Sequence, residues 1–421
     1  MVGLITSLAT APAAAQNSEA AATLPETTIT NIAFTPPVPA NTQGNRLDLF
    51  LPERAAGKPV PLLIWTSGSA WTSDTGKTGA STWANQLRPL GFAVAGVSIR
   101  SSSQVKFPGQ LHDIKAAIRW LRHNADEYGL DPSRFAIAGN SSGGWTATMA
   151  GVTGGVSEEL EGTTGVTGVS SRVQAVVDFY GPTNFQLMDY QERSIIVHDS
   201  PTSPESQLIG CAIQTCPELT QRANPVNYVS ADDPPFLIFH GTADNLVPHG
   251  QSRILYEAMR ANCHDATFHS VPGAGHAHSY LGNTSQAQNQ TVFKSLDCAE
   301  TITQGFTGGT EPNYAYIADF LHRAFVSGEV DAPVTTAKLT SDAITGQGWY
   351  VKAVVSLTAE DGWGSGVATT EYRVNNGKWT TYNRPVKVDG NGERLFEYRS
   401  IDRNGNVEET KVLTFRAVGK H

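Results

Sequence analysis

Several features that mark common protein classes are scarce or missing in this sequence of 421 residues. No uninterrupted apolar run reaches the length of about 20 residues that a membrane-spanning helix needs. Charged residues make up 16% of the chain, the formal net charge is -9, and Lys and Arg form no cluster. Nucleic-acid binding depends on such clusters because they neutralise phosphates. The sequence therefore predicts a soluble protein with no membrane span and no nucleic-acid partner.

Cysteine is also rare, with four residues in the whole chain. They fall as two pairs of sequence neighbours, Cys211 with Cys216 and Cys263 with Cys298, and none has the spacing of a Cys or His metal site. We expect two local disulfides, a pairing inferred from proximity alone because four cysteines allow three connectivities. Four free thiols are the alternative.

The N-terminus, MVGLITSLATAPAAAQ, has a short apolar run followed by an A-x-A site that ends at Ala15. Signal peptidase cleaves after such sites, although the Lys or Arg that usually opens a signal peptide is missing here. We interpret residues 1–23 as a signal-like segment, with a flexible Ala-rich tail as the alternative. Because disulfides persist in oxidising compartments, the expected location is secreted or periplasmic.

Short apolar runs alternate with helical periodicity over most of the chain. Strands are predicted at the runs RLDLFLP, PVPLLIWT, GFAVAGVSI, RFAIAG, VQAVVDFY, PPFLIFHG and ATFHSV. Helical spacing of apolar residues begins after Pro108 and ends near Gly129, and it returns at 252–261. Because parallel strands need crossover connections, this alternation predicts a doubly wound, mostly parallel α/β sheet with helices on both faces.

The chain changes character at two places. Residues 184–227 are rich in Pro, Ser, Asn and Gln without a clear period, which predicts an insertion that forms a lid or pocket wall. A linker-like stretch at 328–335 is followed by strand-like runs separated by NNG, DGNG and DRNGN turns, which are typical of hairpins. We therefore predict an α/β domain over residues 24–327 and a small all-β sandwich over 336–421.

One pentapeptide carries a chemical signal. Gly139-Asn140-Ser141-Ser142-Gly143 follows a predicted buried strand and precedes a predicted helix. This is the setting of a nucleophile elbow, in which glycines allow a sharp turn that exposes the serine hydroxyl. The pattern predicts that Ser141 is a nucleophile. A glycine-rich strand end without chemistry is the alternative.

A serine hydroxyl is nearly inert at neutral pH, so Ser141 requires a base and an acid that orients the base. Asp244 and His276 each lie just after a predicted strand, and they follow Ser141 in the chain order that α/β-hydrolases use. We predict that Asp244 is the acid and His276 the base. His278 is the alternative base, whereas His240 lies within a strand end and is expected to be a packed, hydrogen-bonded core residue.

Several segments of the chain resemble a known family. The segments LLIWTSGSAW, FPGQLHDIKAAIRWLRHNADEYGLDPSRFAIAGNSSGGW, DFYGPTNF, SPESQLIG, ANPVNYVSADDPPFLIFHGTADNLVPHGQS and VPGAGH are similar to the bacterial feruloyl and acetylxylan esterase group of the α/β-hydrolases, relatives of hormone-sensitive lipase. The resemblance spans residue 45 to about residue 325. It implies the same nucleophile, acid and base, at Ser141, Asp244 and His276. The C-terminal segment resembles immunoglobulin-like β modules of exported bacterial enzymes.

The loop of residues 67–71 departs from the family pattern H-G-G-G-W, because it reads S-G-S-A-W here. The oxyanion of an ester-cleaving intermediate needs at least two N–H donors, one of them usually on the residue after the nucleophile, which is Ser142. By the resemblance, the N–H groups of Ser69 and Ala70 join it. Side chains at these two positions narrow the backbone conformations available, which affects the donor geometry and the acyl size accepted.

Two tryptophans flank the predicted site in the sequence. Trp71 and Trp145 are candidate pocket residues, and buried packing alone is the equal alternative.

Together these features predict a secreted serine carboxylesterase that works through an acyl-enzyme and needs no metal or organic cofactor. The expected substrates are small or polymeric esters, namely acetyl or feruloyl esters of polysaccharides, or polyesters. A prolyl-oligopeptidase type of peptidase is one alternative, although we see no length for its N-terminal propeller. A non-catalytic binding protein on the same scaffold is the other. The C-terminal domain is expected to be a spacer or to contact polymer or the cell surface.

Overall fold

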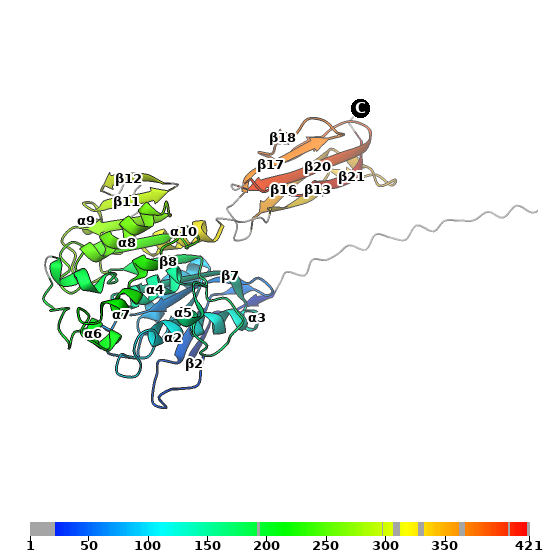
Figure 1. The fold of residues 1–421 in the computed structure, drawn as a ribbon. Helices are drawn as coiled ribbons and strands as arrows, with labels where there is room; N and C mark the ends of the chain where they lie inside the picture. The colour runs from blue at the N-terminus through cyan, green and yellow to red at the C-terminus, as the bar shows by residue number, and fades with distance from the viewer. Residues whose placement is uncertain are drawn as a thin grey trace, which may run out of the picture.

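The structure, a computed structural model, describes residues 22–191, 194–296, 298–305, 312–326, 332–361, 367–402 and 405–418 (Figure 1). The predicted signal-like segment at 1–23 lies almost entirely outside the described residues, and so does the first half of the predicted linker, 328–331. An α/β region is followed along the chain by an all-β region. No helix in the described part of the chain is both long enough and apolar enough to cross a membrane.

A ten-stranded sheet forms the centre of the α/β region, in the order β12-β11-β10-β9-β8-β7-β5-β6-β3-β2. The strands from β6 to β10 in this order run parallel, while β2, β3, β11 and β12 at the two edges are antiparallel. The bounds are β2 Thr27–Ala33, β3 Arg46–Leu51, β5 Val60–Thr66, β6 Ala93–Val97, β7 Leu130–Asn140, β8 Ala175–Phe179, β9 Phe236–Gly241, β10 Ala266–Val271, β11 Thr291–Leu296 and β12 Ala299–Gln304. A separate pair joins β1 Thr23–Leu24 to β4 Arg54–Ala55.

Helices cover both faces of this sheet (Figure 1). Every residue of β5, β6, β8 and β9 is buried, as continuous apolar strands require. One hydrophobic cluster lies on the side of α2, α4 and α8, and a second lies on the side of α1 and α10. The helices are α1 Ala80–Leu87, η1 Arg88–Leu90, α2 Gly109–His123, α3 Ala125–Tyr128, α4 Ser142–Val152, α5 Glu158–Glu161, α8 Gly250–Ala261, α9 Thr284–Ala287 and α10 Tyr314–Val326. The predicted doubly wound α/β fold is confirmed.

The insertion at 184–227, which has no period in the sequence, folds into short helices. They are η2 Phe185–Tyr190, α6 Pro204–Ile209, α7 Pro217–Arg222 and η3 Pro225–Tyr228. None exceeds six residues, so none is long enough to repeat an apolar face. The disulfide Cys211–Cys216 closes the short loop between α6 and α7. The disulfide Cys263–Cys298 joins the residues after α8 to the β11–β12 turn. Both pairs are the ones expected from sequence proximity.

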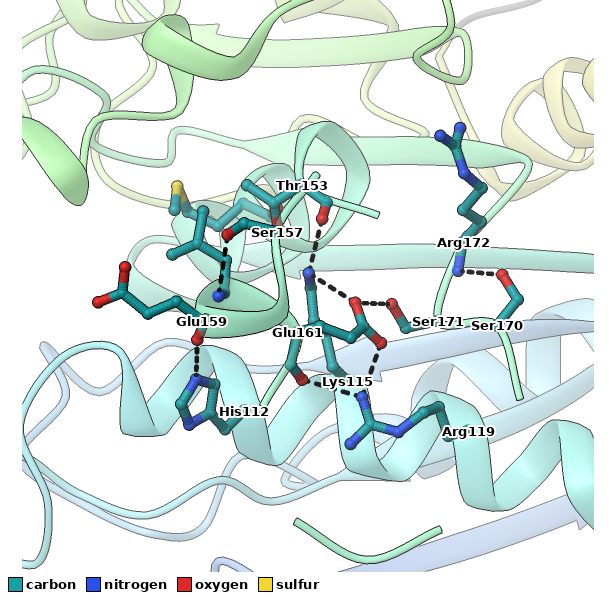
Figure 2. A network of polar contacts seen from close by, with 12 residues as sticks. His112, Lys115, Arg119, Thr153, Ser157, Glu159, Glu161, Ser170, Ser171 and Arg172 are labelled. Carbon is teal, nitrogen blue, oxygen red and sulfur yellow. Dashed lines mark hydrogen bonds and ion pairs between the residues drawn. The ribbon is translucent and has the colours of Figure 1, made fainter. Parts of the chain in front are cut away.

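A polar network holds the segment between α4 and β8 against α2 (Figure 2). Lys115 Nζ lies 3.0 Å from Glu161 Oε2, and Arg119 Nη1 lies 2.7 Å from Glu161 Oε1. Lys115 also donates to Thr153 O at 2.7 Å, and Ser171 Oγ donates to Glu161 at 2.8 Å. Burial lowers the pKa of Lys115. Burial alone would raise the pKa of Glu161, but its cationic partners and hydrogen bonds hold that pKa below the usual value.

The C-terminal region consists of two sheets, in the orders β13-β16-β19 and β14-β15-β21-β20-β17-β18. Its strands are β13 Val334–Thr340, β14 Ala343–Ile344, β15 Tyr350–Val351, β16 Ala353–Glu360, β17 Val367–Val374, β18 Thr380–Thr381, β19 Val386–Val388, β20 Gly392–Asp402 and β21 Lys411–Val418. They enclose a small core of their own that includes Val355, Phe396 and Phe415. The all-β prediction is confirmed, and β13 begins two residues before the predicted domain start at 336.

Candidate active site

The G-N-S-S-G segment forms a sharp turn between β7 and α4. Ser141 has φ 55° and ψ -128°, a conformation that residues other than glycine rarely adopt. Glycines are required on both sides of it. A Cβ at Gly139 would lie 2.2 Å from Gly143 O, and a Cβ at Gly143 would lie 2.2 Å from Thr66 O. The structure therefore has the backbone of a nucleophile elbow at the carboxyl end of β7.

This turn lies where the order of the strands reverses. The chain runs from β5 to β6 on one side and returns to β7 on the other side of β5. Open α/β sheets bind ligands at such a reversal, beyond the carboxyl ends of the strands, because the connections diverge there. Ser141 thus lies at the carboxyl end of β7, next to the loop that follows β5.

Asp244 and His276 form a hydrogen-bonded pair in the loops after β9 and β10. His276 Nδ1 lies 2.7 Å from Asp244 Oδ2, and the Asp244 side chain is fully buried whereas that of His276 is 17% exposed. The N–H groups of Leu246 and Val247 donate to Asp244 Oδ1 at 2.9 and 3.0 Å. Because an ionised carboxylate only accepts hydrogen bonds, His276 Nδ1 donates the proton in this contact.

A second histidine contacts the same carboxylate. His240 Nε2 lies 3.3 Å from Asp244 Oδ2 and 3.0 Å from Val247 O. Both oxygens are acceptors, so Nε2 carries the proton and Nδ1 accepts from Ser252 Oγ at 2.8 Å. Burial alone would raise the pKa of Asp244, but hydrogen bonds from His240 and His276 hold that pKa well below its usual value. The sequence indicated a packed, hydrogen-bonded His240 but not this contact with Asp244.

The alternative base, His278, is directed elsewhere. Its Nδ1 is hydrogen-bonded to the Tyr180 hydroxyl at 2.9 Å, and burial lowers its pKa. The Tyr180 ring in turn packs beside His276, with ring centroids 4.6 Å apart. Within the described residues, His276 and His240 are the histidines paired with Asp244, and His278 is not. His278 therefore lies beside the Asp244–His276 pair without contacting Asp244.

The loop of residues 67–71 crosses directly over the elbow. A Cβ at Gly68 would lie 2.4 Å from Asn140 O, 2.6 Å from Ser141 Cβ and 3.1 Å from Ser142 N. Only a glycine fits at such a distance. Gly68 is also the position of this loop that matches the first glycine of the pattern H-G-G-G-W. Asn140, Ser141 and Ser142 of the elbow therefore pack closely against the loop after β5.

Hydrogen bonds determine which amides of this loop are free. The N–H of Gly68 donates to Asn140 Oδ1 at 3.1 Å, and the N–H of Ser69 donates to Ser142 Oγ at 2.9 Å. The expected donor on Ser69 is thus occupied by a side chain, which reasoning from backbone pattern alone missed. The amides of Ala70 and Ser142 have no partner among the described residues.

The two candidate pocket tryptophans are packed in the core. Trp71 and Trp145 are buried and meet edge to face, with ring centroids 5.3 Å apart. Phe185 of the insertion packs against both rings, at 5.6 and 6.2 Å. Trp145 Nε1 donates to Ala223 O at 2.8 Å. Their positions therefore agree with the alternative of buried packing, and the Trp71 ring ties the end of the 67–71 loop to the core.

An open hollow of about 450 Å³ lies beside His276. Aromatic rings and hydroxyl groups form much of its wall, and none of its described residues is Lys, Arg, Asp or Glu. The lining consists of Tyr180, His276, Ala277, His278, Ser279, Leu281 and Tyr314. Among the described residues, no group of three or more His, Cys, Asp and Glu side chains is arranged to hold a metal ion.

The sequence pattern of the BD-FAE family matches residues 47–259, which hold the elbow, the 67–71 loop and Asp244. The chain belongs to the BD-FAE family. It is 28% identical over 284 residues to "Probable carboxylic ester hydrolase LipM" of Mycobacterium tuberculosis, a match that covers 65% of this chain and 62% of LipM. It is 30% identical to "Esterase LipC" of the same organism, covering 56% of this chain and 57% of LipC. The chain thus spans about three fifths of the length of these curated relatives.

Two solved structures are similar to this BD-FAE member over more than two thirds of its length. A "Truncated form of carbohydrate esterase from gut microbiota" is 32% identical with a TM-score of 0.57, covering 71% of this chain and 96% of that one. A "Bifunctional GH43-CE" of Bacteroides eggerthii is 31% identical with a TM-score of 0.58, covering 70% of this chain and 38% of that one. The resemblance to this group of α/β-hydrolase esterases, expected from the sequence, is confirmed.

Proposed function

We propose that this chain is a serine carboxylic ester hydrolase in which Ser141 is the nucleophile, His276 the base and Asp244 the group that orients the base. The observation that carries the proposal is the buried Asp244 hydrogen-bonded to His276 Nδ1 at 2.7 Å, with Ser141 in a strained turn at the same edge of the sheet. Family membership and the esterase names of the relatives support it.

The reaction divides into acylation and deacylation. His276 Nε2 accepts the Ser141 hydroxyl proton as Oγ bonds to the ester carbonyl carbon, and the carbonyl oxygen becomes an oxyanion. The free amides of Ala70 and Ser142 are the proposed donors to that oxyanion. When the intermediate collapses, His276 returns the proton to the leaving alcohol and Ser141 keeps the acyl group. Water then gives a proton to His276 as it attacks the acyl carbon, and His276 passes that proton to Ser141 Oγ as the bond from Ser141 to the acyl group breaks and the acid leaves.

The direction of proton transfer locates the alcohol half of the substrate. Because His276 must protonate the leaving oxygen, the alcohol lies against His276, which is where the hollow of about 450 Å³ opens. Its wall combines the rings of Tyr180 and Tyr314 with the Ser279 hydroxyl, and none of its described residues is Lys, Arg, Asp or Glu. Such a wall suits a neutral ring that bears hydroxyl groups. We therefore propose carbohydrate esters as substrates ahead of polyesters, which the carbohydrate esterase likeness also favours.

Export remains part of the proposal. The disulfides Cys211–Cys216 and Cys263–Cys298 are compatible with an extracellular or periplasmic protein. Residues 1–23 are proposed as the targeting segment, and contact of the C-terminal domain with polymer is proposed as an accessory role.

The test compares wild type with Ser141→Ala on p-nitrophenyl esters of increasing acyl length, on an acetylated oligosaccharide and on a proline peptide. We expect wild type to cleave the esters and Ser141→Ala to lose at least about 10³-fold in kcat, since the nucleophile is gone. A fluorophosphonate should label wild type at Ser141 and leave His276→Ala unlabelled. Undiminished turnover by Ser141→Ala, or cleavage of the peptide in place of the esters, refutes the proposal.

A further inference from the structure

We propose that the Ser142 hydroxyl is a positioning group that fixes the 67–71 loop so that the Ala70 N–H is presented to the oxyanion, an inference that rests on the proposed function. Ser69 and Ala70 stand where the family pattern has glycines, which are the residues that adopt unusual backbone conformations without strain. The Ser142 hydroxyl supplies hydrogen bonds that hold this loop in place despite its side chains. Ser142 then serves twice, through its own amide as one donor and through its side chain as the support of the other.

The backbone of the loop is in a conformation that requires support. Ala70 has φ 52° and Trp71 has φ 54°, so two successive residues with side chains lie in the left-handed region. Side chains disfavour this region because Cβ crowds the neighbouring carbonyl oxygen. Such conformations persist where surrounding contacts over-determine them, and they cluster at active sites. The hydrogen bonds of this loop are therefore expected to matter more than in a relaxed turn.

The Ser142 side chain contacts the loop on both sides of Ala70. Its Oγ accepts from Ser69 N–H at 2.9 Å and, over a longer distance of 3.4 Å, from Trp71 N–H. Ala70, between these two amides, is left with the unpaired N–H. Ser142 is buried, so water cannot take over the two hydrogen bonds. One hydroxyl group thus selects which of three successive amides stays available.

Other contacts hold the ends of the loop. Gly68 N–H donates to Asn140 Oδ1 at 3.1 Å, and Ser102 N–H donates to Trp71 O at 2.7 Å. The Trp71 ring is packed in the core against Trp145. With both ends fixed, loss of the Ser142 hydroxyl would release the middle of the loop, where Ala70 lies, and leave the fold intact.

The consequence is specific to the transition state. The oxyanion carries a full charge only after Ser141 attacks, so a misplaced Ala70 N–H weakens the transition state more than the bound ester. The signature is therefore a loss in kcat with little change in KM.

The experiment measures kcat and KM of the full chain on a p-nitrophenyl ester for wild type, Ser142→Ala and Ser142→Cys. Cysteine keeps the shape of the side chain and is a poorer acceptor, so it serves if the alanine variant does not fold. We expect kcat to fall about 10- to 100-fold with KM within about threefold. A trifluoromethyl ketone, whose adduct with Ser141 bears an oxyanion, should lose affinity in proportion to kcat/KM.

Thr148→Val is the matched control. Thr148 lies on the same helix α4, is buried, and its hydroxyl has no hydrogen-bond partner in the described residues, so the variant removes a hydroxyl without freeing an amide. Its kcat should match wild type. Wild-type kcat and ketone affinity in both Ser142 variants, or a loss confined to KM, overturns the inference. Activity that survives Ser141→Ala overturns the proposed function instead, whatever the Ser142 variants do.

Discussion

The charge balance of the network in Figure 2 makes a quantitative prediction for Glu161→Gln. The side chains of Lys115 and Arg119 are 0% and 2% exposed, and Glu161 is the carboxylate that pairs with both. Glutamine keeps an accepting oxygen at this position but removes the negative charge, so two buried cations lose their counter-charge. Removing one partner of a buried ion pair costs about 3–5 kcal/mol. Because Glu161 itself is 25% exposed and its charge is partly screened, we expect the lower end, about 3 kcal/mol.

The assay is urea unfolding, monitored through tryptophan fluorescence. With an m-value of about 3 kcal/mol/M, the midpoint of Glu161→Gln should fall by about 1 M. Glu159→Gln on the same helix is the control, because Glu159 pairs with Arg222 at the surface and such pairs contribute less than about 1 kcal/mol. Equal midpoints for the two variants would refute the reasoning.

The effect of pH provides an internal check. The folded protein holds the pKa of Glu161 below its usual value of 4.5. The stabilisation is therefore complete above pH of about 4.5 and is lost as the pH falls through the lower pKa of the folded state. The difference in unfolding free energy between wild type and Glu161→Gln should shrink over that acid range. A difference that stays constant down to pH 3 would show that the charge of Glu161 is not its source.

Two further predictions concern the interior and the disulfides. Burial raises the pKa of Asp178 to about 7. Wild type should therefore lose stability relative to Asp178→Asn as the pH rises from about 4 to 7. A difference in urea midpoints that does not change with pH would contradict this. The Cys263–Cys298 bridge closes a loop of 35 residues and Cys211–Cys216 one of 5. Alanine at both positions of each pair should therefore cost about 4 and about 2 kcal/mol in unfolding free energy, and the reverse order would refute the loop-entropy account.

The sequence predicted those strands and helices whose apolar residues form a long run or a regular period. The buried strands and the helix after Pro108 were accessible because each presents a continuous apolar run or a sustained helical period. The hairpin of β11 and β12 was missed because its residues are largely exposed and alternate weakly. The helices in 184–227 were missed because each is too short to show a period.

The candidate site divides in the same way. Ser141, Asp244 and His276 each follow a predicted strand. Because the carboxyl ends of parallel strands meet at one edge of the sheet, their common location could be predicted. The contact of His240 with Asp244 and the hydrogen bonds of the Ser142 hydroxyl depend on distances across the folded chain. No local sequence pattern encodes such distances, so neither the His240–Asp244 contact nor the Ser142 hydrogen bonds could be predicted.

The Cys263–Cys298 bridge has a further consequence for a protein exposed to proteases. It closes the segment that contains β10, the His276 loop, α9 and β11 into a covalent ring. A protease that cuts this ring once leaves both fragments linked through sulfur, with the sheet contacts of β10 still in place. Nicked molecules would migrate as a single species until a reductant separates the pieces. The base of the proposed triad thus lies on a segment that a single cleavage does not detach.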